Sequence, residues 1–245
     1  MNRFTKKIVV LGTACVMCLA ALTGCGNSID PDKVVAKVGD EEITLGAANF
    51  FARLQQASYE TYYAGMMGTT GEDMWNQTDG SGASYQDTVK DGLMDNLTTM
   101  YVLRQHAGDY NISISDDEKK AMEKAAEDFL KSNNEEVLKA LTADKETIEE
   151  VLELMTIQQK MNVPLMEEAE KAAEAAKESE SEESKESESE TTESEVDAQA
   201  AIDYQYNEII TKWKDDVKVE IDDDLWNQVD FKKEGFTIKQ QEESK

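Results

Sequence analysis

The sequence is poor in the residue types from which most enzyme and metal sites are built. Its 245 residues include one histidine, His106, and three cysteines, of which Cys15 and Cys18 lie in an apolar N-terminal stretch. A structural zinc site needs several thiolate or imidazole ligands, so this composition excludes one. The sequence also contains no glycine-rich phosphate loop and no serine-elbow motif. We therefore predict no catalytic residue, no metal ion and no cofactor.

The two remaining candidates for chemistry have simpler interpretations. His106 falls near the end of a predicted helix, where the helix dipole favours an imidazole, and its nearest acidic neighbour in sequence is Asp109. The run Asp222–Asp224 lacks the glycine and the ligand spacing of a calcium-binding loop. It is typical of a helix cap.

Basic residues are scarce as well. The chain has 25 Lys and Arg against 52 Asp and Glu, which gives a formal net charge of −27. Nucleic-acid binding requires a basic patch, and none occurs, so nucleic acid is excluded as a partner. An anionic membrane surface would repel the chain, so any membrane attachment has to come from a lipid group.

Residues 1–24 follow the pattern of a bacterial secretory signal. Three basic residues precede the apolar stretch Ile8–Leu22, which is too short to span a bilayer. The stretch ends in Leu22-Thr23-Gly24-Cys25, which resembles the lipobox of bacterial lipoproteins. We predict that Cys25 is acylated and anchors the protein to the outer face of the cytoplasmic membrane. The alternative is an ordinary signal peptide that carries a cysteine by chance.

Composition divides the rest of the chain. Lys177–Glu195 contains no apolar residue and cannot bury enough surface to offset its ordering entropy, so it is typical of a disordered linker. After the signal peptide, we expect a tether at 25–33, a helical domain at 34–176, an acidic Ser/Glu linker at 177–198, a helix and strand at 199–232 that return to the same domain, and a tail at 233–245. Because signal cleavage would leave Cys25 as the only cysteine, we expect this domain to have no disulfide and to be stabilised by core packing alone.

Most of the predicted elements are helices. Thr44 is expected to cap a helix, Ser115 and Glu118 form a capping-box pattern, and a long helix runs from about Asp144 with a kink at Pro164. The Gly- and Met-rich segment 66–82 reads as a loop.

Two strand-like segments lie far apart in the sequence. Val34–Val38 and Val217–Ile221 both show strand patterns, and apart from a brief return at Glu42–Thr44 we expect neither to have a partner nearby in sequence. If the two pair, they close the chain into one domain. The sequence therefore predicts a mainly α fold with a two- or three-stranded β element that joins its N- and C-terminal segments.

Three motifs resemble one known family. The segments Val35–Thr44, Ile112–Glu118 and Tyr206–Ile221 are similar, in order and spacing, to the helical chaperone module of SurA and PrsA-type foldases. The lipobox is consistent with the PrsA group. The parvulin isomerase domain of that family is missing, because residues 109–234 contain neither glycine nor histidine. The resemblance implies binding of unfolded, newly secreted proteins without prolyl isomerase catalysis.

Client binding requires apolar side chains that stay exposed. The aromatic and methionine residues at helical spacing are candidates, since flexible thioethers suit surfaces that accept varied partners, and core packing is the alternative for each of them. The predicted client-binding residues are Phe50, Phe51, Leu54, Tyr62, Met66, Met155 and Met161. The alternatives for the whole protein are a solute-binding lipoprotein, a scaffolding envelope lipoprotein and a degenerate prolyl isomerase.

Overall fold

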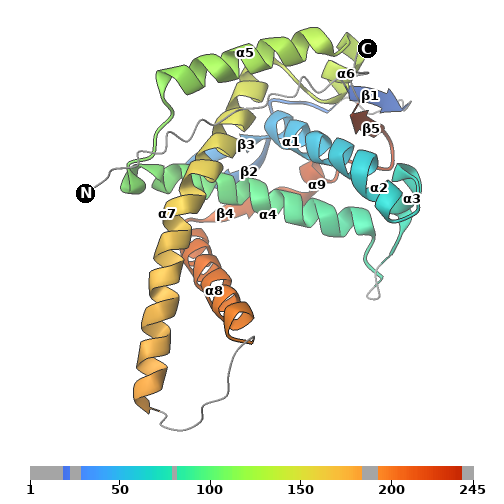
Figure 1. The fold of residues 1–245 in the computed structure, drawn as a ribbon. Helices are drawn as coiled ribbons and strands as arrows, with labels where there is room; N and C mark the ends of the chain where they lie inside the picture. Colours follow the sequence, from blue (N-terminus) through green and yellow to red (C-terminus); the bar gives the residue numbers. More distant parts are fainter. Residues whose placement is uncertain (1–18, 23–28, 79–81, 184–192, 239–245) are drawn as a thin grey trace, which may run out of the picture.

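A computed structural model describes residues 19–22, 29–78, 82–183 and 193–238. The structure is 71% helical and 10% strand, so the predicted mainly α fold with a small β element is confirmed. Figure 1 shows a body of packed helices from which the far ends of α7 and α8 project as an arm. Cys25 and residues 1–18, which carry most of the predicted signal peptide, lie outside the described residues. None of the described helices is long and apolar enough to cross a membrane.

The small sheet joins distant parts of the chain. Strands β2 (Val34–Val38) and β3 (Glu41–Thr44) form an antiparallel hairpin, and β4 (Val219–Ile221) pairs antiparallel with the other edge of β2. The predicted pairing of the N- and C-terminal strands is therefore confirmed. Gly39 forms the hairpin turn with a positive φ of 60°, a conformation that glycine adopts without steric cost.

Helix α1 (Leu45–Ser58) starts where the sequence predicts. Thr44 caps it by accepting a hydrogen bond from the N–H of Ala47 at 3.1 Å. The helix continues through one π-helical turn, η1 (Tyr59–Tyr63), into the short helix α2 (Ala64–Met66).

The loop predicted at 66–82 is wrong over part of its length. Residues Gly71–Asn76 form helix α3, and the Thr70 side chain caps it. The helix forms because Met74 and Trp75 on its inner face are fully buried in the main core. Because their neighbours in sequence are glycine and polar residues, no helical pattern marks Met74 and Trp75 as core residues.

Four helical elements complete the body. They are α4 (Tyr85–His106), the 3-10 turn η2 (Ala107–Tyr110), α5 (Asp116–Ser132) and α6 (Glu135–Ala140). The capping box before α5 is confirmed, because Ser115 and Glu118 exchange side chain to backbone hydrogen bonds.

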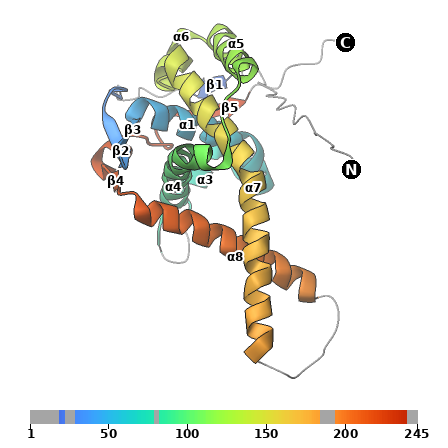
Figure 2. The same cartoon turned by 90° about the vertical axis from the view of Figure 1, so that its left-hand side faces the viewer.

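The arm is formed by the far ends of α7 (Lys145–Glu183) and α8 (Glu193–Asp216). The two helices cross and contact each other (Figures 1 and 2). Their contact with the end of α4 encloses a second apolar cluster, formed by Leu103, Ala107, Ile157, Met161, Leu165 and Ile210. Helix α7 continues through Pro164. The predicted linker 177–198 overlaps both helices, and its central part, 184–192, lies outside the described residues.

The C-terminal segment also departs from the prediction. Asp222 caps the short helix α9 (Asp223–Trp226) as expected, but Gly235–Ile238, within the predicted tail, forms strand β5. The strand is held because Phe236 is fully buried in the main core. Its partner is β1 (Leu19–Leu22), which belongs to the predicted signal peptide.

Candidate functional site

Among the described residues, the exposed large apolar side chains are most concentrated in and just after the π-helical turn. Tyr62, Tyr63, Met66 and Met67 come from η1, α2 and the residue after it, and are 52%, 50%, 83% and 45% exposed. We call these four residues the Tyr62–Met67 patch. Two of them, Tyr62 and Met66, are residues that the sequence predicts to bind clients. π-Helical turns are rare and occur frequently at functional sites.

The inner side of η1 is firmly held. The Glu60 carboxylate accepts hydrogen bonds from the Trp75 indole N–H at 2.7 Å, from the Gln56 amide at 2.6 Å and from the Phe236 backbone N–H at 2.8 Å. Burial raises the pKa of Glu60, and these three hydrogen bonds oppose that rise. The ring of Tyr59 packs against Trp75 and Tyr63. The patch is thus the outer face of a rigid turn.

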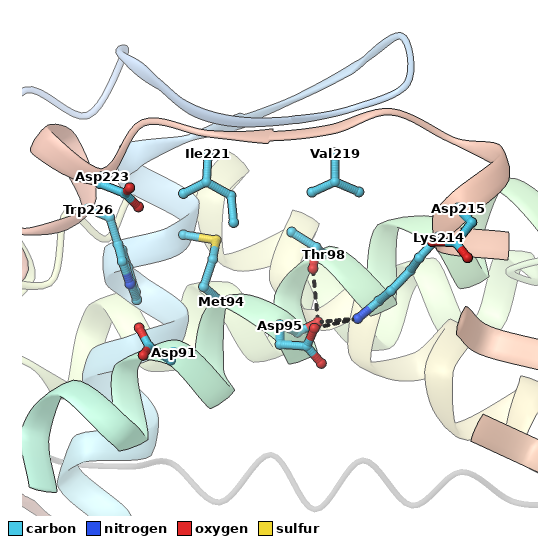
Figure 3. A pocket seen from close by; sticks show the side chains of 10 residues that line it. All are labelled: Asp91, Met94, Asp95, Thr98, Lys214, Asp215, Val219, Ile221, Asp223 and Trp226. Atoms are coloured by element: carbon cyan, nitrogen blue, oxygen red, sulfur yellow. Dashed lines mark hydrogen bonds and ion pairs between the residues drawn. The ribbon is translucent and has the colours of Figure 1, made fainter. Parts of the chain in front are cut away.

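A second candidate is a cavity of about 580 Å³ between α4, the end of α8, β4 and α9 (Figure 3). Its apolar surface comes from Met94, Val219, Ile221 and Trp226. Four carboxylates and one ammonium group also line it, contributed by Asp91, Asp95, Asp215, Asp223 and Lys214. This combination suits an apolar group that carries positive charge.

An ion pair between α8 and α4 forms part of the cavity wall. Lys214 on α8 donates to Asp95 on α4 at 2.6 Å, and Thr98 donates to the backbone oxygen of Asp95 at 2.9 Å (Figure 3). At the other end, the indole N–H of Trp226 is buried and makes no hydrogen bond to any described residue. The Lys90 ammonium lies 5.2 Å from the centroid of the Trp226 ring.

Three of the predicted client-binding residues belong to the core instead. Phe50 and Phe51 are each 2% exposed, and Met161 is fully buried between α7 and its neighbours. Phe50 packs edge-on against Phe129 of α5, with ring centroids 5.5 Å apart. Met161 packs instead against Leu103 of α4 and Ile210 of α8 in the second apolar cluster. These three side chains offer no surface to a client in this structure.

The other predicted residues lie closer to solvent. Leu54 is partly buried against the main core. Met155 is 41% exposed on α7 and does not belong to the Tyr62–Met67 patch.

The polar candidates have structural roles. His106 stacks on Trp213 with ring centroids 4.1 Å apart, and its Nδ1 lies 3.1 Å from Asp109 Oδ2. Asp222 accepts a hydrogen bond from the N–H of Leu225 at 3.0 Å, which makes it the cap of α9. Within the described ranges, no three His, Cys, Asp or Glu side chains are grouped so that they could hold a metal ion.

Sequence reasoning missed the cavity completely. Its lining comes from segments more than 100 residues apart, Asp91–Thr98 and Lys214–Trp226. The only signal that brings them together is the pairing of β2 with β4, which places the chain after α8 beside α4. Nothing local in either segment marks a site.

Comparison of the chain with protein-family models, with curated proteins and with solved structures finds no match. The resemblance to SurA and PrsA-type foldases therefore stays a prediction that rests on short motifs. Both sheets of the described residues are antiparallel, unlike the parallel sheets expected of a two-lobed solute-binding protein.

Proposed function

We propose that this chain is a lipid-anchored, chaperone-like protein of the bacterial cell envelope. It is held at the outer face of the cytoplasmic membrane through Cys25, and it binds apolar segments of unfolded, newly secreted proteins. It does not catalyse prolyl isomerisation.

The Tyr62–Met67 patch is the observation that carries the proposal. Four large apolar side chains within six residues remain exposed, whereas the other exposed large apolar side chains of the described residues are scattered singly. Contiguous exposed apolar surface in a soluble domain marks an interaction site. Tyrosine and methionine also suit varied partners, because one offers a rigid amphipathic ring and the other a flexible thioether.

Charge supports the same function. The net charge of −27 keeps the protein soluble while apolar surface is exposed, and it repels other copies of the chain. The acidic cavity beside α9 offers a second contact for client segments that combine apolar and basic residues. With the proposed anchor at Cys25, both surfaces would face the compartment where exported chains emerge unfolded.

The experiment is an aggregation assay with a chemically unfolded client and the processed protein. We expect the wild-type protein to reduce light scattering by the client several-fold at equimolar or higher ratio. The double variant Tyr62→Ser/Met66→Ser should lose at least half of this protection. The matched control is Val163→Ser/Tyr204→Ser, which removes two side chains that are 52% and 60% exposed on α7 and α8. It should protect like the wild type.

Two results would reject the proposal in different ways. Absence of protection by the wild-type protein rejects chaperone-like binding altogether. Equal loss in both double variants rejects the patch as the binding surface. A prolyl-peptide isomerisation assay on the same preparation should give the uncatalysed rate.

A further inference from the structure

Strand β5 has two occupied edges, and its outer edge is taken by a segment of the predicted signal peptide. Strand β1 pairs antiparallel with β5 in the register Leu19↔Ile238 to Leu22↔Gly235 (Figure 1). The Leu19 side chain is 1% exposed within the main apolar core. Its backbone N–H donates to Asn133 Oδ1 at 2.8 Å. The fold thus binds an extended apolar segment through strand pairing and a buried site for the Leu19 side chain.

Strand β5 is also held by contacts that do not involve β1. On its inner edge, the N–H of Phe236 donates to Glu60 at 2.8 Å and the N–H of Ile238 donates to Thr61 at 2.9 Å. The Phe236 side chain is fully buried, and the Arg53 guanidinium lies 5.3 Å from its ring centroid. These contacts come from α1 and η1, and none of them involves a residue of β1.

Signal cleavage before Cys25 would remove β1 and leave the outer edge of β5 without a partner. In an antiparallel ladder the N–H and C=O of one residue point to the same side, and the side alternates along the strand. Because Phe236 and Ile238 point their N–H groups toward η1, Gly235 and Thr237 direct theirs toward β1. An edge of this kind is a template for another extended chain.

We propose that, in the processed protein, the outer edge of β5 binds an extended segment of a client as an added antiparallel strand. A leucine-sized apolar side chain of the client fills the site that Leu19 occupies here. This inference rests on the proposed function and adds to it a defined site and a binding mode. Backbone hydrogen bonds supply affinity that is independent of sequence, and the apolar site selects the register.

The occupant is an unfolded polypeptide rather than a second copy of the chain. The segment that the site accepts, Leu19–Leu22, is short, apolar and uncharged. Loss of residues 1–24, which carry three basic and no acidic residues, takes the formal net charge from −27 to −30, so pairing two copies edge to edge would bring large like charges together. Exported clients present many short apolar segments before they fold.

Disulfide trapping tests the register directly. The protein is purified from the membrane as the processed lipoprotein, and its intact mass establishes the loss of residues 1–24. Its only native cysteine is then Cys25, which is acylated, so Thr237→Cys introduces a single free thiol. The probe is a fluorescent synthetic peptide that copies residues 19–24 with Ala20→Cys. Ala20 lies opposite Thr237, a pairing that brings the two Cβ atoms to roughly 5 Å.

We expect the probe to link to Thr237→Cys at least tenfold faster than to Asp117→Cys, which carries an exposed thiol on α5. Moving the peptide cysteine to the Ala21 position should abolish the difference, because adjacent residues face opposite sides of a strand. If Thr237→Cys does not fold, as judged by circular dichroism, Gly235→Cys with a peptide cysteine at the Leu22 position gives the same test.

Each other outcome overturns the proposal. Equal linking at Thr237→Cys and Asp117→Cys rejects the strand site, and a disulfide-linked homodimer assigns the edge to a second copy. An intact mass that retains residues 1–24 shows that the chain's own strand closes the site. If client aggregation is still suppressed while no register-specific link forms, the strand site fails and the proposed function survives. If neither aggregation suppression nor a register-specific link is observed, both the proposed function and the strand site are rejected.

Discussion

The Glu60 carboxylate and the backbone N–H of Phe236, 176 residues apart, form a hydrogen bond of 2.8 Å. The same carboxylate holds the Trp75 indole and the Gln56 amide. One partly buried acid therefore connects the turn that carries the Tyr62–Met67 patch to the C-terminal strand. The Tyr62–Met67 patch and the outer edge of β5 share this support.

Replacing Glu60 by alanine is expected to destabilise the protein by roughly 2–4 kcal/mol. The variant leaves the indole N–H of Trp75 and the N–H of Phe236 without their acceptor, and each unsatisfied buried donor costs about 1–3 kcal/mol. Urea unfolding measures the loss. The control is Glu208→Ala on the exposed face of α8, which should stay within about 0.5 kcal/mol of the wild type. An equal effect in both variants would contradict the role of Glu60.

Glu60 should also give stability a defined dependence on pH. Burial raises its pKa in the folded protein above the ordinary value of 4.5, so the folded state binds the proton more tightly than the unfolded state. Its contribution to stability is therefore complete below pH 4.5 and is lost as the pH rises through the raised pKa. The Glu60→Gln variant lacks this contribution.

Unfolding curves of the wild type and of Glu60→Gln, recorded from pH 7 down to pH 4.5, check this sign. The difference in unfolding free energy, wild type minus variant, should increase as the pH falls. A difference that stays constant or decreases over this range would show that the Glu60 proton is not linked to folding in the expected direction.

The helix starts were predictable from local sequence, whereas the elements that depend on long-range packing were not. Thr44, Ser115 and Asp222 cap their helices as expected, because a cap depends only on the few residues that follow it. The pairing of β2 with β4 followed from two strand patterns that lacked local partners. The sequence did not predict strand β5 or helix α3. Each is held by a buried aromatic residue, Phe236 or Trp75, whose neighbours in sequence are mostly polar.

The division between core and surface was the hardest part to predict. Phe50 and Tyr62 lie on the same continuous helical segment, yet one is 2% exposed and the other 52%. The difference arises because α5 covers the end of α1 that carries Phe50 and leaves the π-helical turn open. Periodicity identifies an apolar face but does not say which other element covers it.

Arg53 should be essential for the position of the C-terminal strand. Its buried guanidinium donates to the backbone oxygens of Asp230 and Glu234 and to the Gln56 side chain. Burial lowers the pKa of Arg53 to about 10, which still leaves it charged at neutral pH. Arg53→Leu removes these three hydrogen bonds and leaves the Gln56 side-chain oxygen without its donor, and we expect a loss of roughly 2–5 kcal/mol.

Urea unfolding and hydrogen exchange measure the effect of Arg53→Leu, with faster exchange expected at Phe236 and Ile238 first. Arg53→Lys is the informative comparison, because it keeps the charge but loses the planar fork that reaches several acceptors at once. It should recover less than half of the lost stability. Full recovery would mean that charge alone, rather than the hydrogen-bond geometry, holds the strand.

Pro164 lies inside α7, where its ring removes one backbone donor and crowds the preceding turn. Pro164→Ala restores the hydrogen bond to the Lys160 carbonyl, and we expect unfolding to become harder by roughly 1–3 kcal/mol. Val163→Ala, at the exposed neighbouring position, should change stability by less than about 0.5 kcal/mol. Both variants are compared by urea unfolding. Met161 and Leu165, on either side of Pro164, pack in the second apolar cluster beside Ile210 of α8, so α7 has to keep that contact in the variant to gain stability. A loss of stability in Pro164→Ala would show that the proline sets the course of α7 along α8, and that this packing is worth more than one helical hydrogen bond.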